Sequence, residues 1–284
     1  MYSILRRIGH TGFLPFGLRN RIVRRFVNIG NKQSRPFTAP FNGYTYRGDL
    51  NDSIDWHVYF FREYETGYIR FLEKLAKQFT NTVFWDIGAN VGHHTLFLAR
   101  SCAQIHAFEP NPVTYEKLQQ KISDNNLQNV HTYTFGLGNT NETLSFYVPT
   151  VNNSGTASFE DRSGWGHQKI TAQVRIGDEV ATELRLEQLD LVKIDVEGFE
   201  KDVFEGLRET MNKFRPMIFF ELENNTMKKV GSEQGLFSLF PENYRFVKIA
   251  GVESRKTTVK PFTFAEDAAN VLAFPAEKEK LIYV

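Results

Sequence analysis

The segment Val83–Ala99 (VFWDIGANVGHHTLFLA) combines residues that suit the binding of a small polar ligand. A β-branched and aromatic run ends at Asp86, Gly88 and Gly92 follow, and apolar residues then recur at helical spacing. This pattern predicts a strand, a tight glycine turn and a helix. Glycine permits a ligand to approach the backbone closely, and the N–H groups at the start of the next helix favour a polar or anionic group. We therefore predict a ligand-binding turn formed by Asp86, Gly88, Ala89, Asn90 and Gly92.

The same turn distinguishes between two kinds of nucleotide ligand. A dinucleotide-binding fingerprint would read G-x-G-x-x-G, whereas this chain has D-x-G-x-N-x-G. The carboxylate of Asp86 would repel a diphosphate, but it suits the cationic amine of S-adenosylmethionine (SAM), which carries no phosphate. Glu109 ends a second apolar run, 104–108, at a spacing typical of a carboxylate that holds a ribose diol. SAM is therefore the predicted cofactor, and an NAD-linked oxidoreductase is the alternative.

Strands and helices alternate along the rest of the chain. Apolar or alternating runs predict strands at 83–87, 104–108, 130–138, 144–148, 172–176, 189–196, 216–222, 244–249 and 270–274. Helical patterns occupy 56–79, the segment from Pro112, 197–214 and 233–240. This order predicts an α/β fold with a mostly parallel sheet, helices on both faces and a final antiparallel pair. Ligands of such sheets bind beyond the carboxyl ends of the strands, where Asp86, Glu109, Gly136, Asp195 and Glu221 fall.

The predicted cofactor site extends from the glycine turn toward the second and third strands. Glu109 is expected to hold the ribose, and the residues expected around it and the adenine are Pro110, Asn111, Gly136 and Leu137. Asn111 has an alternative role as a turn residue, because it precedes a proline. Asp195 belongs to the same set, since it ends the central strand beside the turn.

Carboxylates at the ends of the strands 189–196 and 216–222 are candidate bases for methyl transfer. An alcohol is a weak nucleophile, and a base near its proton accelerates the reaction by about 10²–10⁴-fold. The candidates are Asp195, Glu197 and Glu221, and Lys193 lies on the same strand face as the first two. For Lys193 and Glu197 the alternative is an ion pair that closes the strand end. His94 is an alternative base or a packing residue.

No spacing in the sequence is diagnostic of a metal site. Asp195, Glu221 and Asn224 offer hard oxygen ligands, so Mg²⁺ is an alternative means of activating an acceptor hydroxyl. The segment at about 149–171 is too long for a tight turn and predicts a lid-like insert. A disordered excursion is the alternative. The residues of this insert that suit a hydroxylated acceptor are Asn153, Ser158, Trp165 and His167.

Charge divides the chain near residue 48. Residues 1–48 contain nine Lys or Arg and no Asp or Glu, while the remainder holds 25 basic and 33 acidic residues. We predict a basic N-terminal arm and connector at 1–55 and a SAM-dependent methyltransferase domain at 56–284. Between 18 and 27 apolar residues share one helical face, with arginines between them, which predicts a helical arm docked on the acidic core. A membrane-surface helix and an organellar targeting segment are the alternatives.

Composition limits the expected partners and location. The net charge of +1 gives no indication of nucleic acid as a partner. The single cysteine, Cys102, excludes an intrachain disulfide and favours a reducing, cytoplasmic compartment, with peripheral membrane contact through the arm as an option. No apolar run reaches the roughly 18 residues that a membrane span needs. The sequence does not predict an oligomeric state.

Five motifs resemble the FkbM family of SAM-dependent methyltransferases. In chain order they are DIGANVGHHTLFLA, FEPNPVTYEKLQQ, GLGN, LVKIDVEGFEKDVFEGL and PMIFFELE, of which KIDVEG is the most specific. The segment REYETGYIRFLEKL also looks like the family's usual lead-in. The resemblance implies a seven-stranded, Rossmann-like class I methyltransferase fold. It also implies O-methylation of a hydroxyl on a sugar, glycan or other polyhydroxylated natural product. His93 and His94 depart from the family pattern, in which an aromatic or small residue is usual.

Two other functions remain open beside O-methylation. An N-methyltransferase acting on nucleic acid would be expected to carry an Asn-Pro-Pro-Tyr-type tetrapeptide, which this chain lacks. A SAM-binding protein without catalytic activity would not need carboxylates at the strand ends. The expected partner is therefore a small-molecule or glycan acceptor rather than a nucleic acid.

Overall fold

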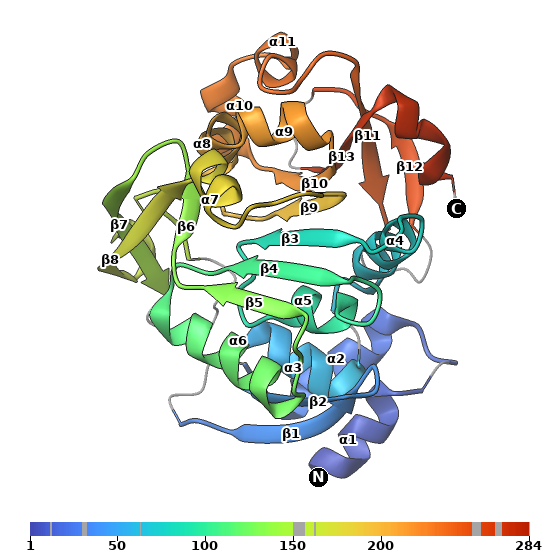
Figure 1. Cartoon of the computed structure of the whole chain (residues 1–284). Coiled ribbons are helices and arrows are strands. Elements are labelled where there is room, and N and C mark those ends of the chain that lie inside the picture. Colours follow the sequence, from blue (N-terminus) through green and yellow to red (C-terminus); the bar gives the residue numbers. More distant parts are fainter. Residues whose placement is uncertain are drawn as a thin grey trace.

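The computed structural model describes residues 1–11, 13–29, 33–62, 64–149, 157–161, 163–251, 257–264 and 269–283. Within these ranges its centre is an eight-stranded sheet in the order β12-β11-β13-β10-β9-β3-β4-β5 (Figure 1). β3, β4, β5, β9 and β10 are parallel, whereas β11, β12 and β13 are joined by antiparallel pairing. The strands are β3 (Val83–Ile87), β4 (Gln104–Phe108), β5 (Val130–Tyr133), β9 (Leu191–Ile194), β10 (Met217–Leu222), β11 (Tyr244–Ala250), β12 (Thr258–Pro261) and β13 (Ala269–Pro275).

This sheet confirms the predicted α/β class and the Rossmann-like fold. Seven of its strands correspond to predicted runs, and β12 is an additional edge strand that the sequence pattern did not reveal. β3 pairs with β4 on one side and with β9 on the other, so the strand order reverses between β3 and β9. Ligands of open α/β sheets bind at such a reversal. The pairing also places Asp86 of β3 directly beside Lys193 of β9.

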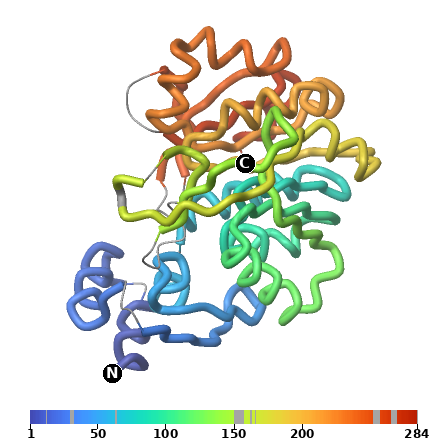
Figure 2. The backbone as a smooth tube through the Cα atoms, turned by 90° about the vertical axis from the view of Figure 1, so that its left-hand side faces the viewer, coloured from blue at the N-terminus to red at the C-terminus, as the bar shows by residue number. Residues whose placement is uncertain are grey.

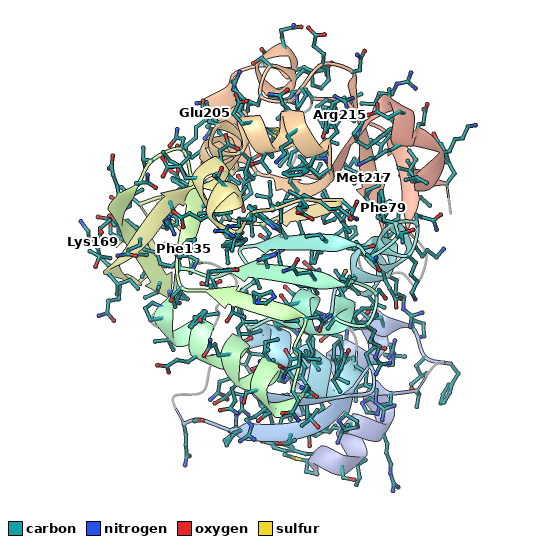
Figure 3. All side chains as sticks on the ribbon, in the orientation of Figure 1. Phe79, Phe135, Lys169, Glu205, Arg215 and Met217 are labelled. Carbon is teal, nitrogen blue, oxygen red and sulfur yellow. The ribbon has the colours of Figure 1, made fainter. Side chains whose placement is uncertain are left out.

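Helices cover both faces of the sheet, because alternate residues of a strand point to opposite sides. On β3, Trp85 packs in the cluster that includes α8 and α9, while Phe84 packs in the cluster under α4. Met217, labelled in Figure 3 at the start of β10, is buried in the same cluster as Phe84, whereas Lys169 lies at the outer margin of the molecule. The helices are α4 (Thr66–Ala76), α5 (His93–Leu98), α6 (Pro112–Asp124), α7 (Gly177–Glu183), α8 (Glu200–Gly206), α9 (Arg208–Phe214), α10 (Asn224–Val230) and α11 (Glu233–Phe237), with a 3₁₀ helix at Ala276–Ile282.

Two predicted helices are each divided in the structure. The segment 56–79 forms α3 (Ser53–Phe61) and α4, because Arg62 and Glu65 have φ values of 56° and 48° in the left-handed region. The segment 197–214 forms α8 and α9, and its helix begins only at Glu200 because Glu197 has a φ of 54°. Helical periodicity continues across both breaks, so the single helices predicted from it were wrong. The breaks place Glu65 and Glu197 beside the same cavity.

A separate three-stranded sheet lies at the left of Figure 1, in the order β6-β8-β7. Its strands are β6 (Gly136–Gly138), β7 (Glu142–Pro149) and β8 (His167–Ile176), and a 3₁₀ helix at Ser163–Trp165 precedes β8. The single strand predicted at 130–138 was wrong, since β5 and β6 belong to different sheets. A Cβ on Gly136 would lie 3.1 Å from the ring of Phe159, so only glycine lets β6 pass this ring without displacing it. Of the predicted insert at about 149–171, residues 167–171 belong to β8 and pair with β7, so the insert is shorter than predicted, and residues 150–156 and 162 lie outside the described residues.

The N-terminal arm consists of α1 (Tyr2–Gly9), α2 (Phe16–Phe26) and the hairpin of β1 (Pro36–Phe41) with β2 (Tyr44–Asp49). α1 packs against α2 and α3, and Figure 2 shows these helices at the lower left. Leu5, Val23 and Trp56 are buried in a common cluster between them. α3 crosses the predicted boundary at residue 55, so the division into two domains stays a prediction. Among the described residues, the helices are too short or too polar to cross a membrane.

Candidate active site

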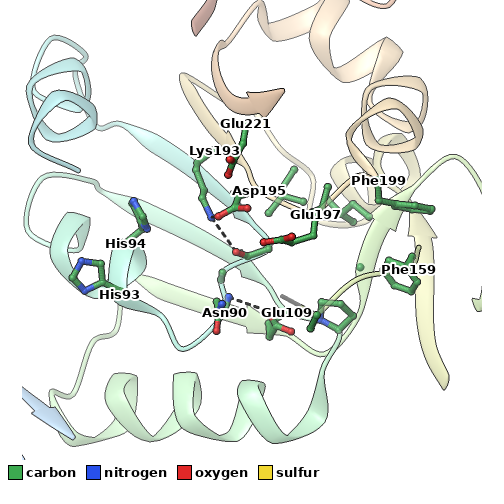
Figure 4. Close-up of a pocket in the computed structure, with 18 of the residues that line it drawn as sticks. Asn90, His93, His94, Glu109, Phe159, Lys193, Asp195, Glu197, Phe199 and Glu221 are labelled. Atoms are coloured by element: carbon green, nitrogen blue, oxygen red, sulfur yellow. Dashed lines mark hydrogen bonds and ion pairs between the residues drawn. The ribbon is translucent and has the colours of Figure 1, made fainter. Parts of the chain in front are cut away.

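A cavity opens at the carboxyl ends of β3, β4, β9 and β10, where the strand order reverses (Figure 4). It encloses about 950 Å³ of empty space, counted out to the solvent at its mouth. Figure 4 shows Phe159 and Phe199 at one end and His93 and His94 at the other, with acidic side chains between them. We call the end with Phe159 and Phe199 the aromatic end, and the part nearer the histidines, where Glu65 lies beside His94, the acidic end.

Gly88 allows the turn after β3 to pass close to β9. Its φ is +77°, and a Cβ at this position would lie 1.9 Å from the backbone oxygen of Asp195. Gly92 also has a positive φ, +80°, and begins α5, whose side chains pack beneath the turn. Gly88 is therefore required for the close packing of this turn against the end of β9, and Gly88, Ala89 and Asn90 line one wall of the cavity.

Glu109 follows β4, and its carboxylate reaches across the glycine turn. Its two oxygens accept hydrogen bonds from the backbone N–H groups of Asn90 and Asn111, each at 2.8 Å. Burial raises the pKa of Glu109 to about 7, although these N–H groups favour its charged form. Each carboxylate oxygen keeps a second acceptor position, so the held carboxylate can also accept hydrogen bonds from a diol in the cavity.

Lys193 of β9 connects the glycine turn to two carboxylates. Its Nζ donates to the backbone oxygen of Gly88 at 3.0 Å and lies 3.1 Å from Asp195 Oδ2 and 3.6 Å from Asp86 Oδ1. The other oxygen of Asp86 accepts a hydrogen bond from Thr95 Oγ1 at 2.6 Å. Burial alone lowers the pKa of Lys193, but the carboxylates of Asp195 and Asp86 outweigh it and hold the pKa above its usual value. Lys193 is therefore charged at neutral pH, and it fixes the turn against β9.

Glu221, at the end of β10, stands at the acidic end of the cavity. Burial and the charges of Asp195 and Glu223 raise the pKa of Glu221 to about 8. Asp195 is bound to Lys193, whereas the described part of the chain offers Glu221 no hydrogen bond or ion pair. A carboxyl with a raised pKa and no protein partner is free to exchange a proton with a ligand.

Glu65 faces the same end from the start of α4. Burial and the charge of Asp195 raise its pKa to about 7, and its Oε2 lies 3.5 Å from His94 Nε2. Burial holds the pKa of His94 well below its usual value, so this imidazole is neutral at pH 7. His93 is turned away from this pair and contacts the backbone oxygen of Tyr64 at 3.0 Å. His93 therefore positions the Tyr64–Glu65 segment, whereas His94 lies beside the Glu65 carboxylate without a hydrogen bond to it.

The loop between β9 and α8 is held by side chains on both sides. Glu200 Oε1 accepts a hydrogen bond from the N–H of Gly198 at 3.2 Å, and Thr226 donates to its other oxygen. Ser158 of the predicted insert donates its hydroxyl to the backbone oxygen of Glu197 at 2.7 Å. The insert is thus tied directly to the loop that carries Glu197.

The cavity brings together most of the residues that the sequence singled out. Those that line it are Gly88, Ala89, Asn90, Glu109, Pro110, Gly136, Leu137, Lys193, Asp195, Glu197 and Glu221. Asp86, Gly92 and Asn111 do not line it. Asp86 has no exposed surface, and Asn111 caps α6 by accepting a hydrogen bond from the Val113 N–H at 3.1 Å. Direct contact of these three with a ligand stays a prediction, and the structure gives each of them a role in positioning the turn.

The predicted insert is described only in part. Asn153 and the side chain of Trp165 lie outside the described residues. Ser158 is buried against the loop at Glu197, and His167 begins β8 without lining the cavity. Contact between these residues and an acceptor therefore stays a prediction.

Sequence reasoning missed the aromatic end of the cavity and the contribution of α4. The ring of Phe159 lies 4.6 Å from that of Phe146 and 4.8 Å from that of Phe199, centroid to centroid. Phe199 follows directly on the KIDVEG string, which was a usable signal. No signal in the sequence marked Glu65 as a site residue, because it fell within a continuous helical pattern.

The alternative with Mg²⁺ depends on whether acidic side chains of the described residues gather as metal ligands do. Among the described residues, no group of three or more His, Cys, Asp or Glu side chains is arranged to hold a metal ion. Asp195 is also already engaged by Lys193. The alternative with Mg²⁺ thus has no geometric support in the described part of the chain.

The chain matches the model of the methyltransferase FkbM domain over residues 86–251. Because this match covers more than half of the chain, the protein belongs to the FkbM family and is a methyltransferase. The matched range contains the glycine turn, Glu109, the strand β9 with Lys193 and the end of β10.

Two curated relatives and one solved structure resemble the chain. The hexuronic acid methyltransferase AglP of Haloferax volcanii is 28% identical over 184 residues, which cover 64% of this chain and 73% of AglP. The 2-O-methyltransferase NoeI of Sinorhizobium fredii is 29% identical over 150 residues, which cover 47% of this chain and 60% of NoeI. The crystal structure of methyltransferase FkbM from Methylobacillus flagellatus KT superposes with a TM-score of 0.46 at 14% identity, over 69% of this chain and 44% of that chain. The matched part thus spans less than two thirds of the last two proteins.

Proposed function

We propose that this protein is a SAM-dependent O-methyltransferase that acts on a hydroxyl of a sugar, glycan or other polyhydroxylated molecule. The observation that carries the proposal is a single cavity with two chemically different ends. A glycine turn, a held carboxylate and aromatic rings form one end, while Glu65, Asp195 and Glu221 surround the other. The first end suits a nucleoside. The second suits hydroxyl groups beside a positively charged sulfonium.

The residues at the first end fit SAM. The backbone from Gly88 to Asn90 lines the cavity and is the proposed contact for the methionine part. Glu109 would hold the ribose diol through the free acceptor positions of its oxygens. The residues that would enclose the adenine are Pro110, Gly136, Leu137 and Phe159. Asp86 would act through Lys193, which it keeps charged.

Glu221 is the proposed base. When bound, SAM supplies a methyl group on a positively charged sulfur, and the carbon–sulfur bond breaks as the acceptor oxygen bonds to the methyl carbon. Glu221 would take the proton of that hydroxyl, because its raised pKa makes it a stronger base than an ordinary carboxylate. Asp195 would accept a hydrogen bond from a neighbouring hydroxyl and so orient the acceptor. Alignment of the two reactants contributes on the order of 7–11 kcal/mol in such reactions.

The acceptor class is supported by the acidic end and by the relatives together. Carboxylates accept hydrogen bonds but donate none when charged, so Asp195, and Glu221 once it is deprotonated, select for a ligand rich in donors, as a polyol is. AglP is named for methylation of a hexuronic acid and NoeI for 2-O-methylation. Both names support methylation of a hydroxylated acceptor by this chain.

The test is incubation of the full chain with methyl-labelled SAM and three acceptors: a glucuronic acid glycoside, a neutral hexose glycoside and an amino compound of similar size. We expect label in an alkali-stable methyl ether of a glycoside, identified by mass spectrometry of the hydrolysed sugar. Label found in the amino compound and in neither glycoside would contradict the proposal and favour N-methylation.

A further inference from the structure

The segment that contains the two N-terminal helices carries an unusual concentration of exposed apolar side chains. The described chain has seven large hydrophobic residues that are exposed, and five of them lie within the first 26 positions: Met1, Ile4, Phe13, Leu18 and Phe26. Phe13 is 81% exposed, the largest fraction among them. The other two, Val113 and Tyr283, are far away along the chain. Isolated exposed apolar residues are ordinary, but five in one short segment indicate a surface that contacts something apolar.

These apolar residues are not signs of a loosely attached segment. Leu5 and Val23 are buried against Trp56 and Phe60 of α3, so the inner faces of α1 and α2 are well packed. Three arginines reinforce this docking, of which Arg19 is buried, Arg6 is half-buried and Arg24 is exposed. The guanidinium of Arg6 lies 4.8 Å from the ring of Tyr59 and that of Arg24 lies 5.5 Å from the ring of Trp56, while Arg19 donates to the backbone oxygen of Gly9 at 2.5 Å.

The remaining arginines of α1 and α2 are on the outside. Arg7, Arg21 and Arg25 are exposed, and none of them has a carboxylate partner among the described residues. On α2 they alternate with apolar residues at helical spacing, since Leu18, Arg21 and Arg25 share one face. On α1, Ile4 and Arg7 share the outer face in the same way. The segment therefore presents positive charge and apolar side chains together, and residues 1–48 contain no acidic residue that would neutralise it.

We infer that this outer face, the arm surface formed by Ile4, Arg7, Phe13, Leu18, Arg21, Arg25 and Phe26, docks the protein on an anionic lipid bilayer. Apolar side chains would enter the boundary between headgroups and acyl chains, and the arginines would meet lipid phosphates. Charge complementarity favours this occupant over a second copy of the chain, because two copies of the arm surface would repel each other. The exposed aliphatic and aromatic residues favour it over nucleic acid, whose backbone contacts use charged and polar groups.

The arm surface is linked to the cavity through one continuous stretch of chain. α1 packs on α3, and the residues that follow α3 lead to Tyr64 and Glu65 in the cavity wall. The inference goes beyond the proposed function, since binding to a bilayer requires neither cofactor nor acceptor.

The test is co-sedimentation of the full chain with vesicles, without cofactor. Phosphatidylcholine vesicles containing phosphatidylglycerol are compared with pure phosphatidylcholine vesicles at low and high salt. We expect binding only to the anionic vesicles and weaker binding in high salt. The triple variant Arg7→Gln, Arg21→Gln, Arg25→Gln should lower the partition coefficient about 100-fold, at roughly fivefold per arginine near an anionic surface. The variant Ile4→Ser, Phe13→Ser, Phe26→Ser should lower it at least about tenfold, through the lost apolar insertion.

The matched control removes the same charge elsewhere. Lys169, Lys260 and Lys280 are exposed and lie outside the arm, and their triple substitution by Gln should change the partition coefficient less than about twofold. Equal melting temperatures of all variants would exclude misfolding, since every substituted side chain is exposed. The inference is overturned if the wild-type chain stays in the supernatant with anionic vesicles at low salt, or if the control loses as much binding as the arginine variant. It is also overturned if the serine variant abolishes self-association of the chain while vesicle binding is unchanged.

Discussion

Replacement of Lys193 by Met should lower the free energy of unfolding by about 3–5 kcal/mol at pH 7.5, because it leaves a buried carboxylate without its partner. Asp86 has no exposed surface, and Lys193 is the only cation that the described residues place beside it. The turn at Gly88 would also lose the hydrogen bond that ties it to β9. The loss is measured by chemical unfolding followed by circular dichroism.

The control for this substitution is Lys201→Met. Lys201 pairs with Glu205 on the surface of α8, with both side chains about 30% exposed. An exposed pair contributes about 0–1 kcal/mol, so this variant should stay close to the wild type. The deficit of Lys193→Met should also shrink toward pH 5. Without the lysine, burial raises the pKa of Asp86 further, so the folded variant is stabilised by protonation at low pH and loses that stability as the pH rises. If Lys193→Met were as stable as Lys201→Met at pH 7.5, the contacts of Lys193 with Asp86, Asp195 and Gly88 would not stabilise the fold, and the prediction would be contradicted.

The second large effect is expected from Glu221→Gln, which should lower kcat by about 10²–10⁴-fold if Glu221 is the base. Since a base acts in its deprotonated form, kcat/KM of the wild type should rise with pH and level off above the pKa of about 8. The Gln side chain cannot titrate, so the rise of kcat/KM toward pH 8, called here the limb near pH 8, should be absent from the pH profile of the variant. The measurement is initial rates of methyl transfer from pH 6 to pH 9.5, with affinity for SAM determined in parallel.

Two further variants separate a catalytic role from a structural one. Glu242→Gln, at an exposed position outside the cavity, should leave both kcat and the pH profile unchanged. Glu65→Gln tests the other cavity carboxylate, whose pKa is about 7. If the limb near pH 8 persists in Glu221→Gln with kcat reduced less than about threefold, Glu221 is not the base. A limb near pH 7 that vanishes only in Glu65→Gln would transfer that role to Glu65.

The parts of the fold that could be predicted from sequence are encoded locally. Buried parallel strands read as apolar runs, so β3, β4, β9 and β10 were found close to their observed positions. Gly88 and Glu109 stood at the ends of such runs, and the rule that ligands bind where strand order reverses then placed them together. Gly88 and Glu109 line the same cavity because the strands that they follow, β3 and β4, are parallel neighbours and end at the same edge of the sheet.

The parts that could not be predicted depend on contacts between distant segments. The local motif placed Asp86 before the glycines, but it did not show that strand register sets Asp86 beside Lys193. Alternation of apolar residues identified β7 and β8 as strands, but alternation does not say which sheet a strand joins. β6 was merged with β5 into one predicted strand for the same reason. Glu65 comes from outside the motifs altogether, since the break before α4 interrupts a periodic pattern that the sequence continues.

The most direct test of the account is calorimetric titration of SAM and S-adenosylhomocysteine into the wild-type protein, Glu109→Ala and the control Glu116→Ala. Glu116 is exposed on the neighbouring helix α6 and does not line the cavity. Two hydrogen bonds to a charged group contribute about 1.5–3 kcal/mol each. We therefore expect micromolar binding by the wild type and by Glu116→Ala, and binding weakened by roughly 100-fold or more in Glu109→Ala. NAD is titrated into the wild type under the same conditions. If the wild type bound NAD but neither SAM nor S-adenosylhomocysteine, the claim that the cavity holds SAM would be contradicted.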